Sequence, residues 1–390
     1  MVATVRRSSK DYETRQFSAY TSSLTELRDW CKENGVSHVA MESTGIYWKP
    51  VFNILEEDFE IILVNARHVK NVPGHKTDKK DSAWLSKLLL SGLLKGSFIP
   101  TKEIRELRDL IRYKKKKVQF VASETNRIIK VLEDCNIKLS SVVSDIKGVS
   151  ASKIINDIID GKDDVAHLLT HVHGRVKAPR EEMAKALTGR ITPHHRFMLK
   201  MIRETIEENE KLIAKVDLQI DMVAAQYQVE LDLLQTTDGV GKATALTIIS
   251  EVGVDMDAFP NQHHLASWAG VSPGSNESAG KKKSTRVIHG NKHLQSALVE
   301  AAWGATRRKD GYLKKFYQKL LVRKGSKKAL VAVSHKIIIA TYFILKNKEA
   351  YKEPLLQIEK AEQKRKQKEV QKTVGQLRKL GFDVRLTPVA

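Results

Sequence analysis

The sequence is short of three things that would each indicate a particular kind of protein: cysteine, an apolar leader and acidic side chains. Its two cysteines among 390 residues, Cys31 and Cys135, lie far apart in ordinary amphipathic segments. This usage argues against a disulfide framework or a zinc set and predicts buried or half-buried thiols of a reducing cytosol. Residues 1–10 contain no apolar core, so nothing in them directs export.

Acidic residues are outnumbered, since 67 Lys and Arg face 46 Asp and Glu, a formal net charge of +21. Each phosphate that a basic side chain neutralises releases a counterion, so this excess indicates a polyanionic partner. DNA ranks well above a membrane surface, because no apolar run is expected to reach the length of a bilayer span. We therefore expect a cytoplasmic protein that binds DNA and no membrane.

The length exceeds what one hydrophobic core usually holds, and we expect several domains. Residues 1–100 alternate strand and helix patterns, which predicts an α/β layered domain whose later strands are parallel. The expected order is strand 2–6, strand 14–18, a helix that buries Leu24, Leu27, Trp30 and Cys31 and ends at Gly35, strand 36–41, helix 48–57, strand 60–64 and a helix carrying Trp84 to Leu93.

Residues 101–228 contain two long apolar seams with helical spacing. The first runs from Ile104 to Cys135 in steps of three and four, and the second from Met198 to Val223 with Asn209 as a polar interruption. Such seams indicate coiled-coil packing, either as an antiparallel arm within one chain or as a dimer seam, and the sequence leaves both open. Residues 229–350 are expected to be mainly helix and loop, and residues 351–390 a basic tail, solvated or dependent on a partner.

Three acids form the first set that can carry chemistry. Glu42 ends a predicted strand, where ligands gather in open α/β sheets, and Asp78 and Asp81 share one face at the start of a helix. Carboxylate oxygens suit Mg²⁺, and such ions can activate an attacking oxygen and stabilise a leaving one. A helix cap is the simpler interpretation of Asp78 alone, but Glu42 and the neighbouring lysines favour a metal site.

A glycine-bounded turn, residues 239–245, contains Gly239, Gly241 and Lys242. It is similar to the turn of helix-hairpin-helix modules, whose backbone N–H groups hold a DNA phosphate at a helix N-terminus. A plain turn between two helices fits nearly as well. The glycine and lysine spacing excludes a P-loop.

A loop of small residues, 273–280, precedes Lys281, Lys282 and Lys283. An ordinary exposed loop is one interpretation. The other is a flexible loop that presents Ser278 as a nucleophile beside cations that attract the scissile phosphate. No general base lies nearby in the sequence.

The histidine pairs lack a cysteine or acidic partner at ligand spacing, so we expect phosphate contacts or surface positions for them. These pairs are His171 with His173, His194–His195, His263–His264 and His289 with His293. Runs of Lys and Arg at residues 114–117, 307–309 and 323–328 are expected to contact the nucleic-acid backbone without reading sequence.

Motifs spread over almost the whole chain resemble the DEDD-type transposases of bacterial insertion sequences, the group described as bridge-RNA-guided serine recombinases. The segments that carry the resemblance are residues 40–45, 64–67, 76–81, 239–241, 265–270, 278–280, 290–291 and 298–302. The resemblance implies an RNase H-like catalytic domain, a helical coiled-coil segment and a mainly α C-terminal transposase domain.

The resemblance also implies roles for single residues. Glu42, Asp78 and Asp81 would be the second, third and fourth acids of a Mg²⁺ site, and Ser278 would form a covalent phosphoserine link to the cut strand. The protein would act as a homo-oligomer on paired DNA ends, with an RNA from the element as guide. A Holliday-junction-type nuclease with water as nucleophile, and a DNA- or RNA-binding copy without activity, are the alternatives.

The first acid of such a site would lie on an opening strand before residues 2–5, and this sequence begins within the following strand. Asp11 is no substitute, because it lies in the expected turn after that strand. Each backbone N–H or C=O group that is buried at a strand edge without a hydrogen-bond partner lowers the stability by about 1–3 kcal/mol. We therefore expect either an upstream start that encodes a short apolar strand with Asp, or a truncated copy.

Overall fold

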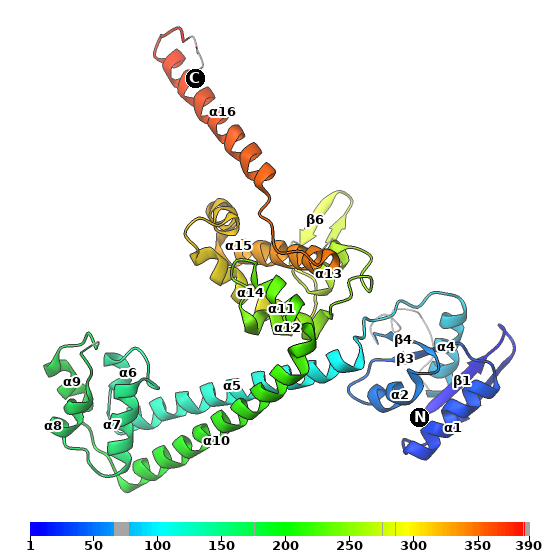
Figure 1. Ribbon diagram of the computed structural model, residues 1–390, viewed down its shortest axis with the longest axis horizontal. Helices are drawn as coiled ribbons and strands as arrows, with labels where there is room; N and C mark the ends of the chain where they lie inside the picture. The colour runs from blue at the N-terminus through cyan, green and yellow to red at the C-terminus, as the bar shows by residue number, and fades with distance from the viewer. Residues whose placement is uncertain (66–77, 175, 275, 285, 385, 387–390) are drawn as a thin grey trace. The chain divides into compact units, whose positions relative to one another are not determined.

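The computed structural model describes residues 1–65, 78–174, 176–274, 276–284, 286–384 and 386. The chain divides into two compact units, Met1–Pro100 (unit 1) and Thr101–Ala390 (unit 2) (Figure 1). The first unit holds strands and helices together. The second is almost entirely helical.

A hairpin opens unit 1. Strand β1 (Val2–Arg6) pairs antiparallel with β2 (Tyr12–Gln16), and the hydroxyls of Thr4 and Thr14 meet across it at 2.9 Å. The second strand begins two residues earlier than expected. The carbonyl of Asp11 accepts hydrogen bonds from two amides of the turn, at 3.0 and 3.2 Å, which closes the turn early enough for pairing to start at Tyr12.

The other two strands of unit 1, β3 (His38–Glu42) and β4 (Glu60–Val64), are parallel, which confirms that prediction. Helix α2 (Trp48–Leu55) connects them, as a parallel pair requires a crossover. Helix α1 (Thr21–Glu33) buries the predicted apolar face, Leu24, Leu27, Trp30 and Cys31. Helix α4 (Asp78–Leu90) completes the unit.

Both cysteines are free and buried, as expected, and burial raises the pKa of Cys31 to about 11.

Two helices form an arm in unit 2. Helices α5 (Lys102–Asp134) and α10 (Pro193–Ala224) pack side by side and antiparallel, with Lys114 Nζ 2.5 Å from Asp217 and Lys117 Nζ 3.2 Å from Asn209 (Figure 1). The interpretation as an intrachain arm is therefore confirmed. Asn209 is buried, and its side chain also donates to the carbonyl of Thr205 at 2.8 Å.

Five short helices cap the far end of this arm and share one apolar core with it, which includes the fully buried Ile154, Ile155 and Ile158. They are α6 (Leu139–Val142), α7 (Val149–Ile159), α8 (Val165–Leu168), η1 (Leu169–His171) and α9 (Arg180–Leu187). We call this part the arm tip.

The rest of unit 2 is a helical bundle with one small hairpin. It consists of η2 (Ala225–Tyr227), α11 (Gln228–Gln235), α12 (Lys242–Val252), α13 (Gln262–Trp268), β5 (Asn276–Ser278), β6 (Lys281–Ser284), α14 (Lys292–Arg307), α15 (Tyr312–Asn347) and α16 (Leu355–Lys379).

Helix α15 is long and apolar enough to cross a bilayer, so the expectation that no apolar run reaches that length is wrong. Its most apolar window is 56% buried within unit 2, and the helix packs on α13 and α14. It also breaks at Gly325, whose φ is 75°. These are the properties of the core helix of a globular unit.

A buried carboxylate, Glu251 of α12, ties the arm to the bundle. Its side chain is 1% exposed and accepts two hydrogen bonds from Arg112 of α5, at 2.8 and 2.7 Å. Arg108, one turn earlier, donates to the carbonyls of Ser250 and Glu251, both at 2.8 Å. Asn291, the N-cap of α14, donates to Glu251 at 2.6 Å. Burial alone would raise the pKa of Glu251, but these hydrogen bonds and the positive charge of the arginines lower it.

Arg112→Leu is expected to destabilise unit 2 by about 3 kcal/mol, because the buried carboxylate of Glu251 loses two hydrogen bonds and the positive charge of Arg112. Urea denaturation of the full chain measures this. Lys147→Ala is the control: it breaks an exposed pair with Glu210 on the same arm, where about 1 kcal/mol or less is at stake.

The same contact gives a pH dependence. A lowered pKa in the folded state means that Glu251 contributes stability above its unfolded pKa of about 4.3 and loses it as the pH falls through the folded value. The difference between wild type and Arg112→Leu should therefore shrink below about pH 4. Equal effects of the two variants at pH 7 would contradict the assignment.

Candidate functional site

Two of the three predicted acids, Glu42 and Asp81, line one cavity in unit 1. The cavity has a volume of about 2150 Å³ and is bounded by every residue of β1, every residue of β3 and most of α4. That volume is more than twice that of a small-molecule pocket, which is roughly 300–1,000 Å³. The space is therefore wider than a site for a small molecule needs, and its size suits a polymer.

The shape of the strands explains this cavity. Among the described residues β1 pairs only with β2 and β3 only with β4, so the two pairs do not form one sheet. The remaining edges of β1 and β3 both border the cavity, and so do Trp30 and Trp84, whose buried indole N–H groups have no hydrogen-bond partner. Backbone edges of this kind are the ones that accept an additional strand.

Glu42 is the last residue of β3, and its position is fixed locally. The amide of Ser43 donates to the carbonyl of Val64 at 2.9 Å, which continues the strand pairing, and the hydroxyl of Thr44 donates to Glu42 Oε1. The carboxylate is exposed at the strand end. Tyr47, which the sequence reasoning passed over, also lines the cavity and is 80% exposed.

Asp81 lies in the first turn of α4 and is exposed. The next residue, Ser82, places it against β1, because the hydroxyls of Ser82 and Thr4 are 2.9 Å apart. Arg6 of β1 holds the following turn through Ser86 at 3.0 Å. Asp78 begins the same helix three residues before Asp81; its side chain lies outside the described residues.

The segment around Ser278 was predicted to be a loop, but residues 276–284 form a β-hairpin, so the prediction of a loop was wrong. Ser278 is the last residue of β5 and is opposite Lys281, the first of β6. Ala279 and Gly280 form the two-residue turn with φ of 50° and 74°, the backbone of a tight hairpin. Lys281 and Lys283 are exposed; the side chains of Ser278 and Lys282 lie outside the described residues.

Two glycines meet at the base of this hairpin and explain two of the sequence motifs. A Cβ on Gly290 would lie 2.2 Å from the amide nitrogen of Gly270, so neither backbone leaves room for a side chain. Gly270 also has a φ of 74°. Asn291 follows directly and caps α14 through the amides of His293 and Leu294, at 3.0 and 3.1 Å. The motif residues therefore hold the hairpin to the bundle.

The turn at residues 239–241 contains two glycines with different environments. Gly239 has a φ of 82°, and a Cβ there would lie 2.1 Å from the carbonyl oxygen of Ala301 in α14. Gly241 caps α12 with open space around it, and Lys242 pairs with Asp221 at 2.8 Å. Close packing of helices thus accounts for Gly239, and only the α12 end remains available to a phosphate.

One histidine prediction was wrong. His171 lies not with His173 but with His167, and both ring Nε2 atoms contact a carboxylate oxygen of Asp157, at 2.5 and 2.7 Å. The spacing of four residues between His167 and His171 was a signal in the sequence. Asp157 could not be recognised, because it comes from a different helix.

Comparison with known proteins finds two transposase family models, of which the first extends past unit 1 into the first helix of unit 2. Residues 1–137 match a family model described as "Transposase", the DEDD transposases of the IS110 type, which implies an RNase H-like fold. Residues 231–318 match the model described as "Transposase IS116/IS110/IS902 family". No curated protein matches the chain.

Both matches identify the class of protein: the chain contains transposase domains, and transposases are enzymes of insertion sequences that cut and rejoin DNA. Within that class, both matched segments are similar to models of IS110-type transposases. The matches show transposase domains; they do not show the guide RNA or the serine–DNA link that the resemblance implies.

The glycine turn gives a test with its own control. Gly239→Ala is expected to lower the stability of the full chain strongly, because the added Cβ meets the Ala301 carbonyl and the φ is unfavourable. Gly241→Ala should change the stability by roughly 1 kcal/mol or less, since nothing lies within contact of its Cβ. Thermal melts compare the two. If Gly239→Ala melts like wild type, packing does not explain this glycine.

Proposed function

We propose that the protein cuts and rejoins DNA as the transposase of a bacterial insertion sequence, with Glu42, Asp78 and Asp81 as acids that hold Mg²⁺ and Ser278 as nucleophile. The observation that carries the proposal is the placement of Glu42 and Asp81 at one cavity, within the segment that matches the DEDD family.

The acids suit the metal. Both described side chains offer exposed carboxylate oxygens, the ligand that Mg²⁺ prefers, and face a space wide enough for a phosphate backbone. Bound there, Mg²⁺ would supply charge stabilisation for the reacting phosphate. The lysine-rich charge of the chain brings the DNA to the site, and the exposed ring of Tyr47 offers a surface on which a nucleobase can stack.

The proposed chemistry at Ser278 needs no outside reactant. Its Oγ attacks the phosphorus, an Oγ–P bond forms, and the bond from phosphorus to one deoxyribose oxygen breaks. The serine proton passes to that leaving oxygen, and attack by a different deoxyribose hydroxyl reverses the steps to rejoin a strand. Lys281, opposite Ser278 in the hairpin, supplies positive charge near the phosphate.

We further propose that an additional extended strand with a fourth acid fills the space between β1 and β3 in the active protein. Two observations support this proposal: among the described residues, one edge of β1 and one edge of β3 have no strand partner, and the buried indole N–H groups of Trp30 and Trp84 have no hydrogen-bond partner. Such a strand would place its acid beside the end of β3, where Glu42 lies.

The remaining parts of the proposal concern location and partners. The protein is proposed to act in the cytoplasm as a homo-oligomer, with an RNA of the element as guide. The basic segments at residues 114–117 and 323–328 offer backbone contacts for DNA or RNA. Gly241, Lys242, Lys282 and Lys283 are proposed as further phosphate contacts.

Ser278→Ala is expected to abolish a covalent protein–DNA adduct while DNA binding stays within about twofold of wild type. Adduct formation is followed by denaturing electrophoresis of labelled DNA. Ser284→Ala, in the opposite strand of the same hairpin, is the matched control and should retain the adduct. Cleavage without any adduct in wild type would favour a nuclease that uses water, and an adduct in Ser278→Ala would exclude this serine.

Asp81→Asn is expected to lower Mg²⁺-dependent cleavage by about 100-fold or more, since removal of a charged ligand costs more than loss of an outer partner, which is worth roughly 10–100-fold. Folding should be preserved, because the side chain is exposed. Asp11→Asn, also exposed but in the β1–β2 turn, should leave cleavage unchanged.

The same assay tests the additional strand. An N-terminal extension that supplies an apolar strand with one Asp should raise cleavage, and replacing that Asp by Asn should remove the gain. If the 390-residue chain already cleaves at the rate of the extended one, the fourth acid is not supplied in this way. DNA binding without cleavage in every form would identify a binding protein.

A further inference from the structure

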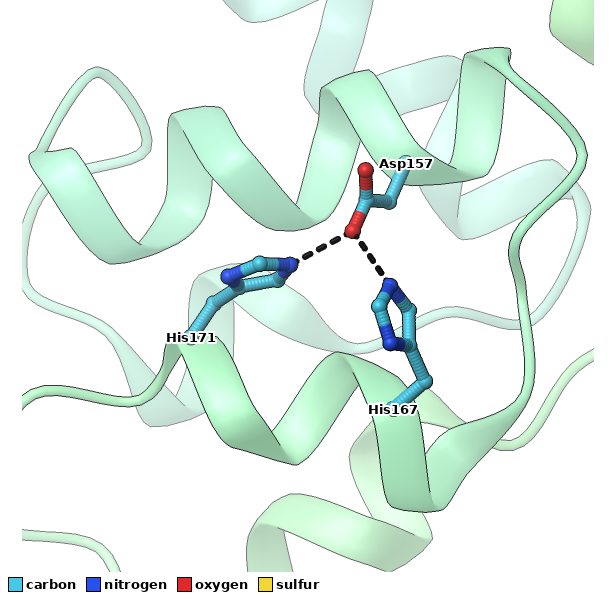
Figure 2. Close-up of side chains that lie close together, drawn as sticks. All are labelled: Asp157, His167 and His171. Carbon is cyan, nitrogen blue, oxygen red and sulfur yellow. Dashed lines mark hydrogen bonds and ion pairs between the residues drawn. The ribbon is translucent and has the colours of Figure 1, made fainter.

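Three side chains capable of binding a metal converge at the arm tip, remote in sequence from the acids of unit 1. Asp157 comes from α7, His167 from α8 and His171 from η1 (Figure 2). One carboxylate oxygen of Asp157 lies 2.7 Å from His167 Nε2 and 2.5 Å from His171 Nε2. Among the described residues, no other group of three His, Cys, Asp or Glu side chains brings its ligand atoms within 4.8 Å of one another.

The backbone around these residues is fixed before any ligand binds. Asp157 lies between Ile155 and Ile158, which are fully buried in the core of the arm tip. Leu168, next to His167, is fully buried as well. The helix that carries His167 begins with a cap, because the carboxylate of Asp164 accepts a hydrogen bond from the His167 amide at 2.9 Å. Rigid supports of this kind are what a metal site requires.

The side chains are partly open to solvent, which leaves a path for an ion. The exposed fractions are 16% for Asp157, 22% for His171 and 44% for His167.

We propose that Asp157, His167 and His171 bind a divalent transition metal ion of the zinc type, which fastens α7 to the α8–η1 segment at the arm tip. The site lies between residues 137 and 231, outside both matched families. Two imidazoles and one carboxylate select zinc-like ions over Mg²⁺, which prefers oxygen ligands alone. This site is therefore chemically distinct from the proposed acids of unit 1.

The geometry needs only a small adjustment. Ligands about 2.0–2.1 Å from a tetrahedral zinc ion lie about 3.3 Å apart. The present nitrogen–oxygen distances of 2.7 and 2.5 Å would open by about 0.6–0.8 Å, which rotations of the side chains supply. Three protein ligands leave a fourth position for water.

Zinc titration of the chelator-stripped full chain, against a chromophoric competitor and with Mg²⁺ in excess, tests the proposal. Wild type should bind one tight zinc per chain and melt at a higher temperature with zinc than without. His171→Gln should weaken that site about 100-fold or more, since loss of an outer partner alone costs roughly 10–100-fold. His173→Gln is the matched control, because His173 is outside the cluster, and should bind like wild type.

Two further measurements keep the test decisive if His171→Gln folds poorly. His167→Gln removes the most exposed ligand, and its helix content is checked by circular dichroism. Co²⁺ bound to wild type should give visible absorption bands of nitrogen and oxygen coordination that His167→Gln lacks. The proposal would be overturned if wild type bound zinc no more tightly than His171→Gln and His167→Gln do. It would also be overturned if His173→Gln weakened zinc binding as much as these two variants.

Discussion

The hydrogen bonds of one buried carboxylate, Glu251, are the constraint on which unit 2 depends. Arg108 and Arg112 bring the arm to it, and Asn291 brings the start of α14. Asn291 also follows Gly290, which packs against Gly270 at the base of the Ser278 hairpin. A single desolvated charge thus connects the arm with the segment that carries the proposed nucleophile. Because a buried charge tolerates little misplacement of its partners, the hairpin base and the arm are held in one fixed relation.

The parts of the fold that depend on local pattern could be predicted from the sequence. The apolar spacing of α1 and of the two arm helices fixed which faces are buried, and alternating β-rich runs marked the parallel strands. Contacts between distant segments could not be predicted in this way. Asp157 and His171 belong to different helices, and Glu251 gains its role only because two arginines more than a hundred residues earlier approach it. The hairpin of Ser278 was missed because its strands are short and polar.

In the candidate site, too, the local positions could be predicted from the sequence, and the contacts between distant segments could not. Glu42 at a strand end and Asp81 at a helix start both line one cavity, and these two positions follow from the order of strands and helices. The space beside them is a property of two strand edges, and no single segment reveals it. The family matches cover the acids and the serine hairpin but not the arm tip. The arm tip therefore has to be understood from its own packing and its own ligands.

The length of the arm has a consequence for any nucleic acid that lies along it. From Arg112, held by Glu251, to Cys135 at the arm tip, α5 rises by about 35 Å at 1.5 Å per residue. One turn of B-form DNA spans about the same distance, roughly 34–36 Å. A duplex parallel to the arm would present the same groove at both ends of this helix. Contacts made at the two ends of the helix would then fall one helical turn of DNA apart, on the same face of the duplex.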